Sequence, residues 1–157
     1  MAETPFDLAK AHRWFAVECN NRAWDLVEAE SLTETEQAEL IQVAHASRYH
    51  WQFAGDALNH LRGEYLLATA YLRAQRGEPA LHHAQLAQEL VNALRKEGEF
   101  EHPFDEVCVL ACLAQGGQLQ QQTTSAESHL KQARKLLAKC TDAGERELLL
   151  KLYPALR

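Results

Sequence analysis

Residues 64–90 read EYLLATAYLRAQRGEPALHHAQLAQEL, and this stretch decides the fold. Its first half places Leu67, Ala68 and Tyr71 on one face of a helix, at steps of one and three residues. Gly77 is predicted to end that helix. A second helix then follows with apolar residues at helical spacing, namely Ala80, Ala84, Ala87 and Leu90. A hairpin of this kind cannot bury its apolar face alone, so it must stack on similar neighbours.

A weaker copy of the pattern follows further along the chain. The pair Leu113-Ala114 corresponds to Leu67-Ala68, and Gly117 takes the place of Tyr71. The second helix of this copy carries the spaced residues Ala126, Leu130 and Ala133. Two copies of one helical pattern in a single chain indicate tandem hairpins rather than an isolated one.

These residues resemble the tetratricopeptide repeat family. Leu67-Ala68 stands where the family has Leu-Gly, and Tyr71 where it has an aromatic residue. Ala80-Leu81 matches the Ala-Leu that opens the family's second helix, and Ala87 matches a later small residue of that helix. The step from Ala80 to Ala126 exceeds the family period of about 34 residues, and the extra residues lie around 98–102. The family's first-helix Trp and closing Pro are missing. The segments 45–51 and 62–65 are also similar to bacterial helical-repeat proteins that have no assigned activity.

The whole chain is predicted to be all-α. About seven helices are expected, over residues 6–29, 33–53, 56–75, 78–96, 104–118, 125–140 and 145–153. The resemblance implies a short right-handed solenoid of antiparallel hairpins within a single domain, residues 1–157. Its parts would be a degenerate N-terminal hairpin (1–54), two repeat-like hairpins (56–97 and 103–140) and a capping helix (143–153).

Helix starts and stops support these ranges. Thr4-Pro5 is predicted to begin the first helix, with Thr4 as N-cap and the proline in the first turn. Thr33 and Glu36 form the pattern of a capping box, in which the side chain of each residue accepts a hydrogen bond from the backbone amide of the other. Pro154 is predicted to stop the last helix because proline lacks an amide donor.

Composition and charge exclude several classes of protein. Sixteen basic against twenty-two acidic residues give a net charge of −6, which argues against a non-specific nucleic-acid binder. No apolar stretch approaches the roughly 18 residues that a transmembrane helix needs. The first residues lack the basic start and apolar run of a signal peptide. Four cysteines without a dense framework fit reduced thiols, so a cytoplasmic location is expected.

Two polar stripes are the candidate binding residues. The first lies on the second predicted helix and contains His45, Arg48, Tyr49 and Gln52. The second occupies positions of the third helix that resemble the groove-facing ones of the repeat family, and contains Arg62, Tyr65, Thr69 and Arg73. Together they would form a locally cationic groove that fits an acidic or C-terminal-carboxylate peptide. The alternative is that both stripes are solvated helix faces.

The leading interpretation is therefore a non-enzymatic module that binds a protein or peptide segment without a cofactor. We find no nucleophile elbow, phosphate loop or dinucleotide fingerprint. The alternative from another class is a small metal- or ligand-dependent enzyme in a helical bundle, using His45, His50 and His60. His45 and His50 are five residues apart, which is not the three- or four-residue spacing that aims two ligands at one metal.

Other residue pairs are predicted to pack. Cys108 and Cys112 share a helix face and are expected in the core, although two thiols at this spacing could also share a metal. Gly116-Gly117 indicates close helix packing or a local bend.

Two tryptophans leave a choice between core and interface. Trp14 and Trp24 lie on one side of the first helix together with Val17 and Asn21. Core packing against the second helix is the favoured reading. The alternative is that this side, or an uncapped end of the solenoid, anchors a partner or a homodimer.

Overall fold

The computed structural model describes residues 6–98 and 100–157, and within them the chain is all-α. Seven α-helices follow one another and a short 3₁₀-helix ends the fold. Their bounds are α1 (Leu8–Glu28), α2 (Glu34–Ala54), α3 (Ala57–Arg73), α4 (Gly77–Glu97), α5 (Pro103–Leu119), α6 (Thr123–Leu137), α7 (Ala143–Leu152) and η1 (Pro154–Leu156). The predicted ranges match these helices to within three residues at each end, and the fold class is confirmed.

Short polar side chains begin several of the helices. At α2, the Thr33 hydroxyl accepts from the Glu36 amide and the Glu36 carboxylate accepts from the Thr33 amide, so the predicted capping box is confirmed. Asp7 caps α1, accepting from the Lys10 amide at 3.1 Å. The predicted cap at Thr4-Pro5 lies outside the described residues.

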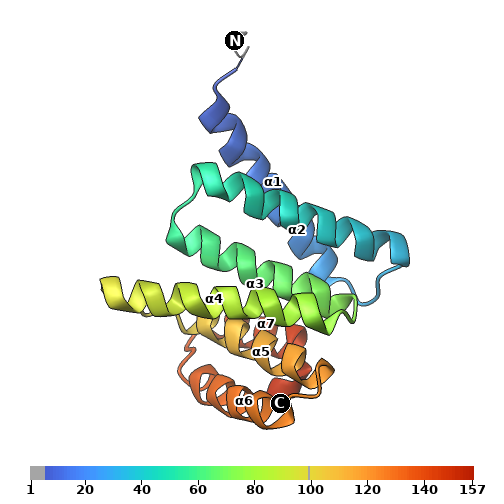
Figure 1. The fold of residues 1–157 in the computed structure, drawn as a ribbon, viewed down its shortest axis with the longest axis vertical. Coiled ribbons are helices and arrows are strands. Elements are labelled where there is room, and N and C mark those ends of the chain that lie inside the picture. The colour runs from blue at the N-terminus through green and yellow to red at the C-terminus, as the bar shows by residue number, and fades with distance from the viewer. Residues whose placement is uncertain (1–5, 99) are drawn as a thin grey trace.

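The helices form three antiparallel hairpins, α1–α2, α3–α4 and α5–α6, stacked in chain order (Figure 1). Each second helix also packs against the first helix of the next hairpin, α2 on α3 and α4 on α5. The first helices touch one another in the order α1, α3, α5. This arrangement creates a face made by α1, α3 and α5, and an opposite face on which α2, α4 and α6 lie.

Small residues let the hairpins approach closely. Ala80, Ala84 and Ala87 are fully buried in α4, as the pattern predicted. Gly116 confirms the predicted close packing, because a Cβ there would stand 3.1 Å from the Leu81 backbone. Cys108 is buried with Cys112 in the main core, which joins α3–α6 to the C-terminal segment. A second core cluster lies among α1, α2 and α3.

The two repeat-like hairpins turn in the same way. Gln75 and Gln121 each adopt a positive φ, 55° and 60°, in the turn that follows the first helix. Gln121 follows Gln75 by the same 46 residues that separate Ala126 from Ala80. The prediction that Gly77 ends the helix is therefore corrected: the reversal takes place at Gln75, and Gly77 is the first residue of α4.

Two predictions about the ends of the stack need correction. Trp14 is not in the core, since 58% of it is exposed, whereas Trp24 packs against both core clusters. The helix expected to cap the stack, α7, instead lies across the α1–α3–α5 face, behind the other helices in the view of Figure 1. No helix in the described part of the chain has the length and apolar content needed to cross a membrane.

Candidate functional site: the inner face and its helix

The inner face is the surface of α1, α3 and α5 against which α7 and η1 pack. The C-terminal segment reaches it with four apolar residues at spacings of three, one and three, namely Leu149, Leu152, Tyr153 and Leu156. Three of them are buried in the main core, and Leu152 packs against the cluster of α1, α2 and α3. This spacing is the pattern by which an amphipathic helix enters a groove.

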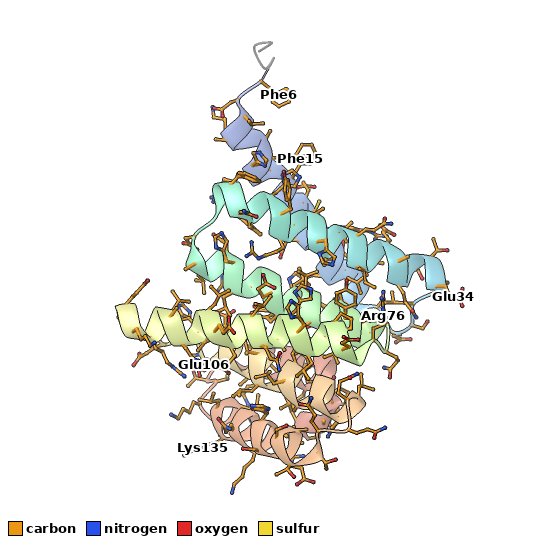
Figure 2. All side chains as sticks on the ribbon, viewed as in Figure 1. Phe6, Phe15, Glu34, Arg76, Glu106 and Lys135 are labelled. Carbon is orange, nitrogen blue, oxygen red and sulfur yellow. The ribbon has the colours of Figure 1, made fainter. Side chains whose placement is uncertain are left out.

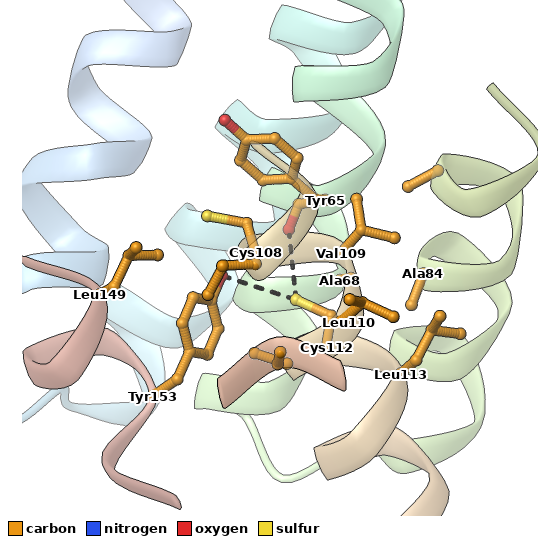
Figure 3. Packing of buried hydrophobic residues seen from close by; sticks show 14 of the residues in the cluster. Tyr65, Ala68, Ala84, Cys108, Val109, Leu110, Cys112, Leu113, Leu149 and Tyr153 are labelled. Carbon is orange, nitrogen blue, oxygen red and sulfur yellow. Dashed lines mark hydrogen bonds between the residues drawn. The ribbon is translucent and has the colours of Figure 1, made fainter. Parts of the chain in front are cut away.

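A chain of hydroxyls joins α7 to α3. The Thr69 hydroxyl donates to the Tyr65 carbonyl oxygen at 2.8 Å. Because a hydroxyl carries one hydrogen, the 2.8 Å contact between Thr69 Oγ1 and Tyr153 Oη requires the tyrosine to donate. Figure 3 shows Tyr153 and Leu149 directed toward Cys108 and Cys112 on α5. Burial raises the pKa of Tyr153 well above its usual range, so the phenol stays protonated and remains a donor.

Polar contacts at the rim hold the rest of the C-terminal segment. Lys151 Nζ lies 3.6 Å from the Glu28 carboxylate on α1. Arg134 Nη2 on α6 donates to the carbonyl oxygens of Ala155 and Arg157 at 2.8 and 3.0 Å. The segment is thus fastened by a buried apolar row and by exposed polar anchors on either side.

The two thiols beside Tyr153 are packing groups. Burial raises the pKa of Cys112 to about 11, although hydrogen bonds with Thr69 and Tyr153 oppose that rise. Burial likewise raises the pKa of Cys108 well above its usual range. Both thiols are therefore protonated at neutral pH and poor nucleophiles, and the prediction that they belong to the core is confirmed.

Asp105 is the inner-face residue that sequence reasoning missed. It is 2% exposed and accepts hydrogen bonds from Arg62 Nε and Nη2, both at 3.1 Å, and from the Tyr65 hydroxyl at 2.8 Å. The hydrogen bonds to Asp105 raise the pKa of the Arg62 guanidinium. An acid in the first turn of α5 reads as a helix-dipole residue, and nothing in the sequence points to partners forty or more residues away.

The four predicted residues on α3 do face one side, but only part of that side is open. Tyr65 and Thr69 are each 3% exposed, so a partner cannot contact their side chains while α7 is in place. They are buried because α7 covers them and Asp105 binds Tyr65. Arg62 is exposed but held by Asp105.

Arg73 is the residue of this set that keeps a donor without a partner among the described residues. Its Nη2 donates to the Ala29 carbonyl oxygen at 2.7 Å, while its Nε is buried and has no hydrogen-bond partner among the described residues. It lines a pocket of about 260 Å³ whose walls include Lys151 and also the acidic residues Glu28 and Glu30. A bound carboxylate or carbonyl could accept from this donor.

The α2 stripe lies on another surface. Arg48 Nε donates to Glu64 Oε1 at 2.7 Å, and His83 Nδ1 contacts Glu64 Oε2 at 2.8 Å. Glu64 is two residues from Arg62 on α3, about 200° around a helix of 3.6 residues per turn. Since His45 contacts Tyr71, also on that far side, at 2.9 Å, the single predicted groove is in fact two surfaces.

The charge at Glu64 is well satisfied. Burial alone would raise the pKa of this carboxyl, but hydrogen bonds from His83 and Arg48 outweigh it and lower the pKa below the ordinary value. Arg48 is therefore a structural residue that ties α2 to α3. Tyr49 and Gln52, the other two residues of the stripe, are exposed near the C-terminal end of α2.

The three histidines of the enzyme hypothesis do not converge. His45 contacts Tyr71, His50 contacts His12 at 2.8 Å between Nδ1 atoms, and the His60 ring contacts the Trp51 carbonyl oxygen at 3.0 Å. Within residues 6–98 and 100–157, no three His, Cys, Asp or Glu side chains are grouped as a metal site requires.

Comparison with known proteins does not assign the chain to a family. No family model matches the chain, no curated protein is significantly similar to it, and no solved structure matches its fold significantly. The inner face must therefore be interpreted from its own geometry.

Proposed function

We propose that the chain is a non-enzymatic binding module of the tetratricopeptide type, whose inner face holds an amphipathic helical segment of a protein or peptide. The observation that carries the proposal is that this face already accommodates such a segment, α7 with η1. A surface that buries Leu149, Tyr153 and Leu156 of its own chain has the shape and the apolar character to bury the same pattern from another chain.

The partner is defined by the contacts that α7 makes. Its apolar residues would follow the spacing of Leu149, Leu152, Tyr153 and Leu156. An acidic residue or a C-terminal carboxylate near the position of Lys151 would meet the unpartnered Nε of Arg73. This favours an acidic helical peptide, and in the described structure the segment with Lys151 occupies that place.

Competition between α7 and a partner sets the affinity. A tethered segment has an effective concentration on the order of millimolar, so a free peptide binds weakly until α7 is loosened. Lys151→Glu removes the pair with Glu28, and Arg134→Ala removes two hydrogen bonds to the chain end. Both residues are exposed, so the core is left intact.

The test uses a fluorescent peptide of residues 143–157 and fluorescence anisotropy. The double variant Lys151→Glu/Arg134→Ala should bind the peptide about tenfold more tightly than the unmodified chain, because the lost contacts contribute about 1–2 kcal/mol. A second peptide with Lys151→Glu places a carboxylate beside Arg73, and adding Arg73→Ala should weaken the binding of that peptide. Arg76→Ala is the matched control, since Arg76 stacks on Tyr71 on the far side of α3. If the loosened chain keeps its helicity but binds no better, the proposal fails.

A further inference from the structure

Exposed aromatic side chains gather at the N-terminal end of the stack. Six of the seven large apolar residues that are exposed in the described structure lie within residues 6–15 and 49–53. They are Phe6, Leu8, Trp14, Phe15, Tyr49 and Phe53. A concentration of this kind is uncommon on a surface that only meets water, and it marks an interaction site. Figure 2 shows Phe6 just before α1 and Phe15 in the N-terminal half of α1, at the end of the stack opposite α6.

The rings are held in fixed positions by one another. His12 stacks on Phe53 with ring centroids 4.5 Å apart, and Phe15 stacks on His50 at 5.3 Å. Trp14 meets Phe15 edge to face at 5.0 Å. Mutual packing reduces the side-chain entropy that binding would cost. We call His12, Trp14, Phe15, Tyr49, His50 and Phe53 the aromatic end.

The two ends of the stack differ. Terminal units of a helical stack need a polar outer surface if they are to face water. The exposed surface of α6, at the far end, meets that need with Lys131, Arg134 and Lys135. The exposed surface of α1 carries Trp14, which is 58% exposed. The aromatic end therefore has the composition of a surface that is buried in a complex.

The charges along α1 indicate what covers it. Lys10 and Glu18 lie four residues before and four residues after Trp14, and all three are exposed on one stripe of the helix. If two copies of α1 cross antiparallel at Trp14, each Lys10 faces the Glu18 of the other copy, and the pair forms twice. Parallel helices would place like charges opposite each other. The pattern is self-complementary, which is the property of an interface with two-fold symmetry.

We propose that the exposed stripe of α1 centred on Trp14, on one side of the aromatic end, is the interface of a homodimer, in which two copies of the chain associate through antiparallel α1 helices about a two-fold axis at Trp14. The partner is a second copy of this chain, held by aromatic contact at the centre and by the Lys10–Glu18 pairs at the edges. The stripe of Lys10, Trp14 and Glu18 includes none of the residues that contact the C-terminal segment, so this proposal does not depend on the proposed function.

The test is sedimentation velocity of the full chain, from low micromolar to submillimolar concentration. We expect a reversible dimer that Trp14→Ala abolishes. Lys10→Glu and Glu18→Lys should each raise the dimer dissociation constant about tenfold, since each turns two attractions into repulsions. The double variant Lys10→Glu/Glu18→Lys should restore dimerisation. Circular dichroism checks that every variant keeps its helices.

The controls lie on α6, where Glu127→Lys and Lys131→Glu change charge four residues apart on the other end of the stack. These should leave the dissociation constant unchanged. A chain that stays monomeric at every concentration would overturn the proposal and assign the aromatic end to a different protein. A dimer whose affinity is not restored in the double charge reversal would overturn the antiparallel arrangement.

Discussion

At the residue scale, the contact between Tyr153 and Thr69 joins the C-terminal segment to the hairpin stack. Both side chains are buried, and their hydroxyls form a directed chain that ends on the Tyr65 carbonyl oxygen. A buried hydroxyl without a partner costs about 1–3 kcal/mol. The contact therefore favours the one register of the C-terminal segment on α3 in which both hydroxyls are paired.

Removing either hydroxyl should lower the stability of the fold. We expect Tyr153→Phe and Thr69→Val each to reduce the free energy of unfolding by about 1 kcal/mol, and the double variant to cost less than the sum. Urea unfolding measures all three values. Tyr71→Phe is the control, because its hydroxyl contacts the exposed His45. Strictly additive costs would show that the two hydroxyls do not interact.

At the scale of the elements, close contacts between helices depend on glycine. A Cβ on Gly77, at the start of α4, would stand 2.5 Å from the Leu119 Cβ at the end of α5. Around Gly98, at the end of α4, nothing lies within 4 Å of the added atom. The two glycines border the same helix and differ in what surrounds them, so they form a matched pair.

Gly77→Ala should destabilise the fold by about 1–3 kcal/mol, the typical cost of overpacking, because α4 and α5 must move apart. Gly98→Ala should be neutral or slightly stabilising, because it only limits the freedom of the unfolded chain. Thermal unfolding of both variants checks this. Equal effects at the two sites would contradict the close approach of α4 to α5.

The α2–α3 contact predicts a response to acid. The pKa of Glu64 is lowered in the folded chain, so the unfolded chain takes up the proton first. The stability from this group is therefore present above its ordinary value of 4.5 and is lost as the pH falls through the lowered folded value. Glu64→Gln should flatten that part of the curve of unfolding free energy against pH. The exposed Glu89→Gln should leave the curve unchanged, and an unaltered curve for Glu64→Gln would contradict the pairing with Arg48 and His83.

The histidine pair on α1 and α2 gives a second pH prediction. Burial and the neighbouring His12 lower the pKa of His50. His12→Ala should therefore raise the His50 pKa toward the ordinary value of 6.5, as followed by NMR titration of the imidazole. A His50 pKa that does not respond would mean that the two rings are not in contact.

At the scale of the whole molecule, local pattern predicted the hairpins but not how they are covered. Ala80, Ala84 and Ala87 repeat at helical spacing, and the cap at Thr33 involves only a residue three positions along the chain. Both features can therefore be recognised from the sequence alone. The placement of α7 cannot, because Tyr153 and Thr69 are far apart in the chain and neither belongs to a recognisable motif. For the same reason the spacing of Arg62, Tyr65 and Thr69 predicts a shared helix face, but the burial of Tyr65 and Thr69 depends on the distant C-terminal segment and cannot be read from that spacing.

The covered inner face also limits what a partner can reach. With α7 in place, Tyr65 and Thr69 are hidden, and a ligand gains access only as the C-terminal segment leaves. Segments with exposed polar anchors open more readily than the core does. Access to the inner face therefore depends on where α7 lies.

Zero-length carbodiimide cross-linking of the unmodified chain, read by mass spectrometry, tests that placement most directly. Lys151 Nζ lies 3.6 Å from the Glu28 carboxylate, so we predict an amide bond between these residues, which Lys151→Arg removes. An excess of the 143–157 peptide should lower its yield. If Lys151 of the natively helical chain couples only to acidic residues within α7 and never to Glu28, the C-terminal segment does not occupy the inner face and the account is contradicted.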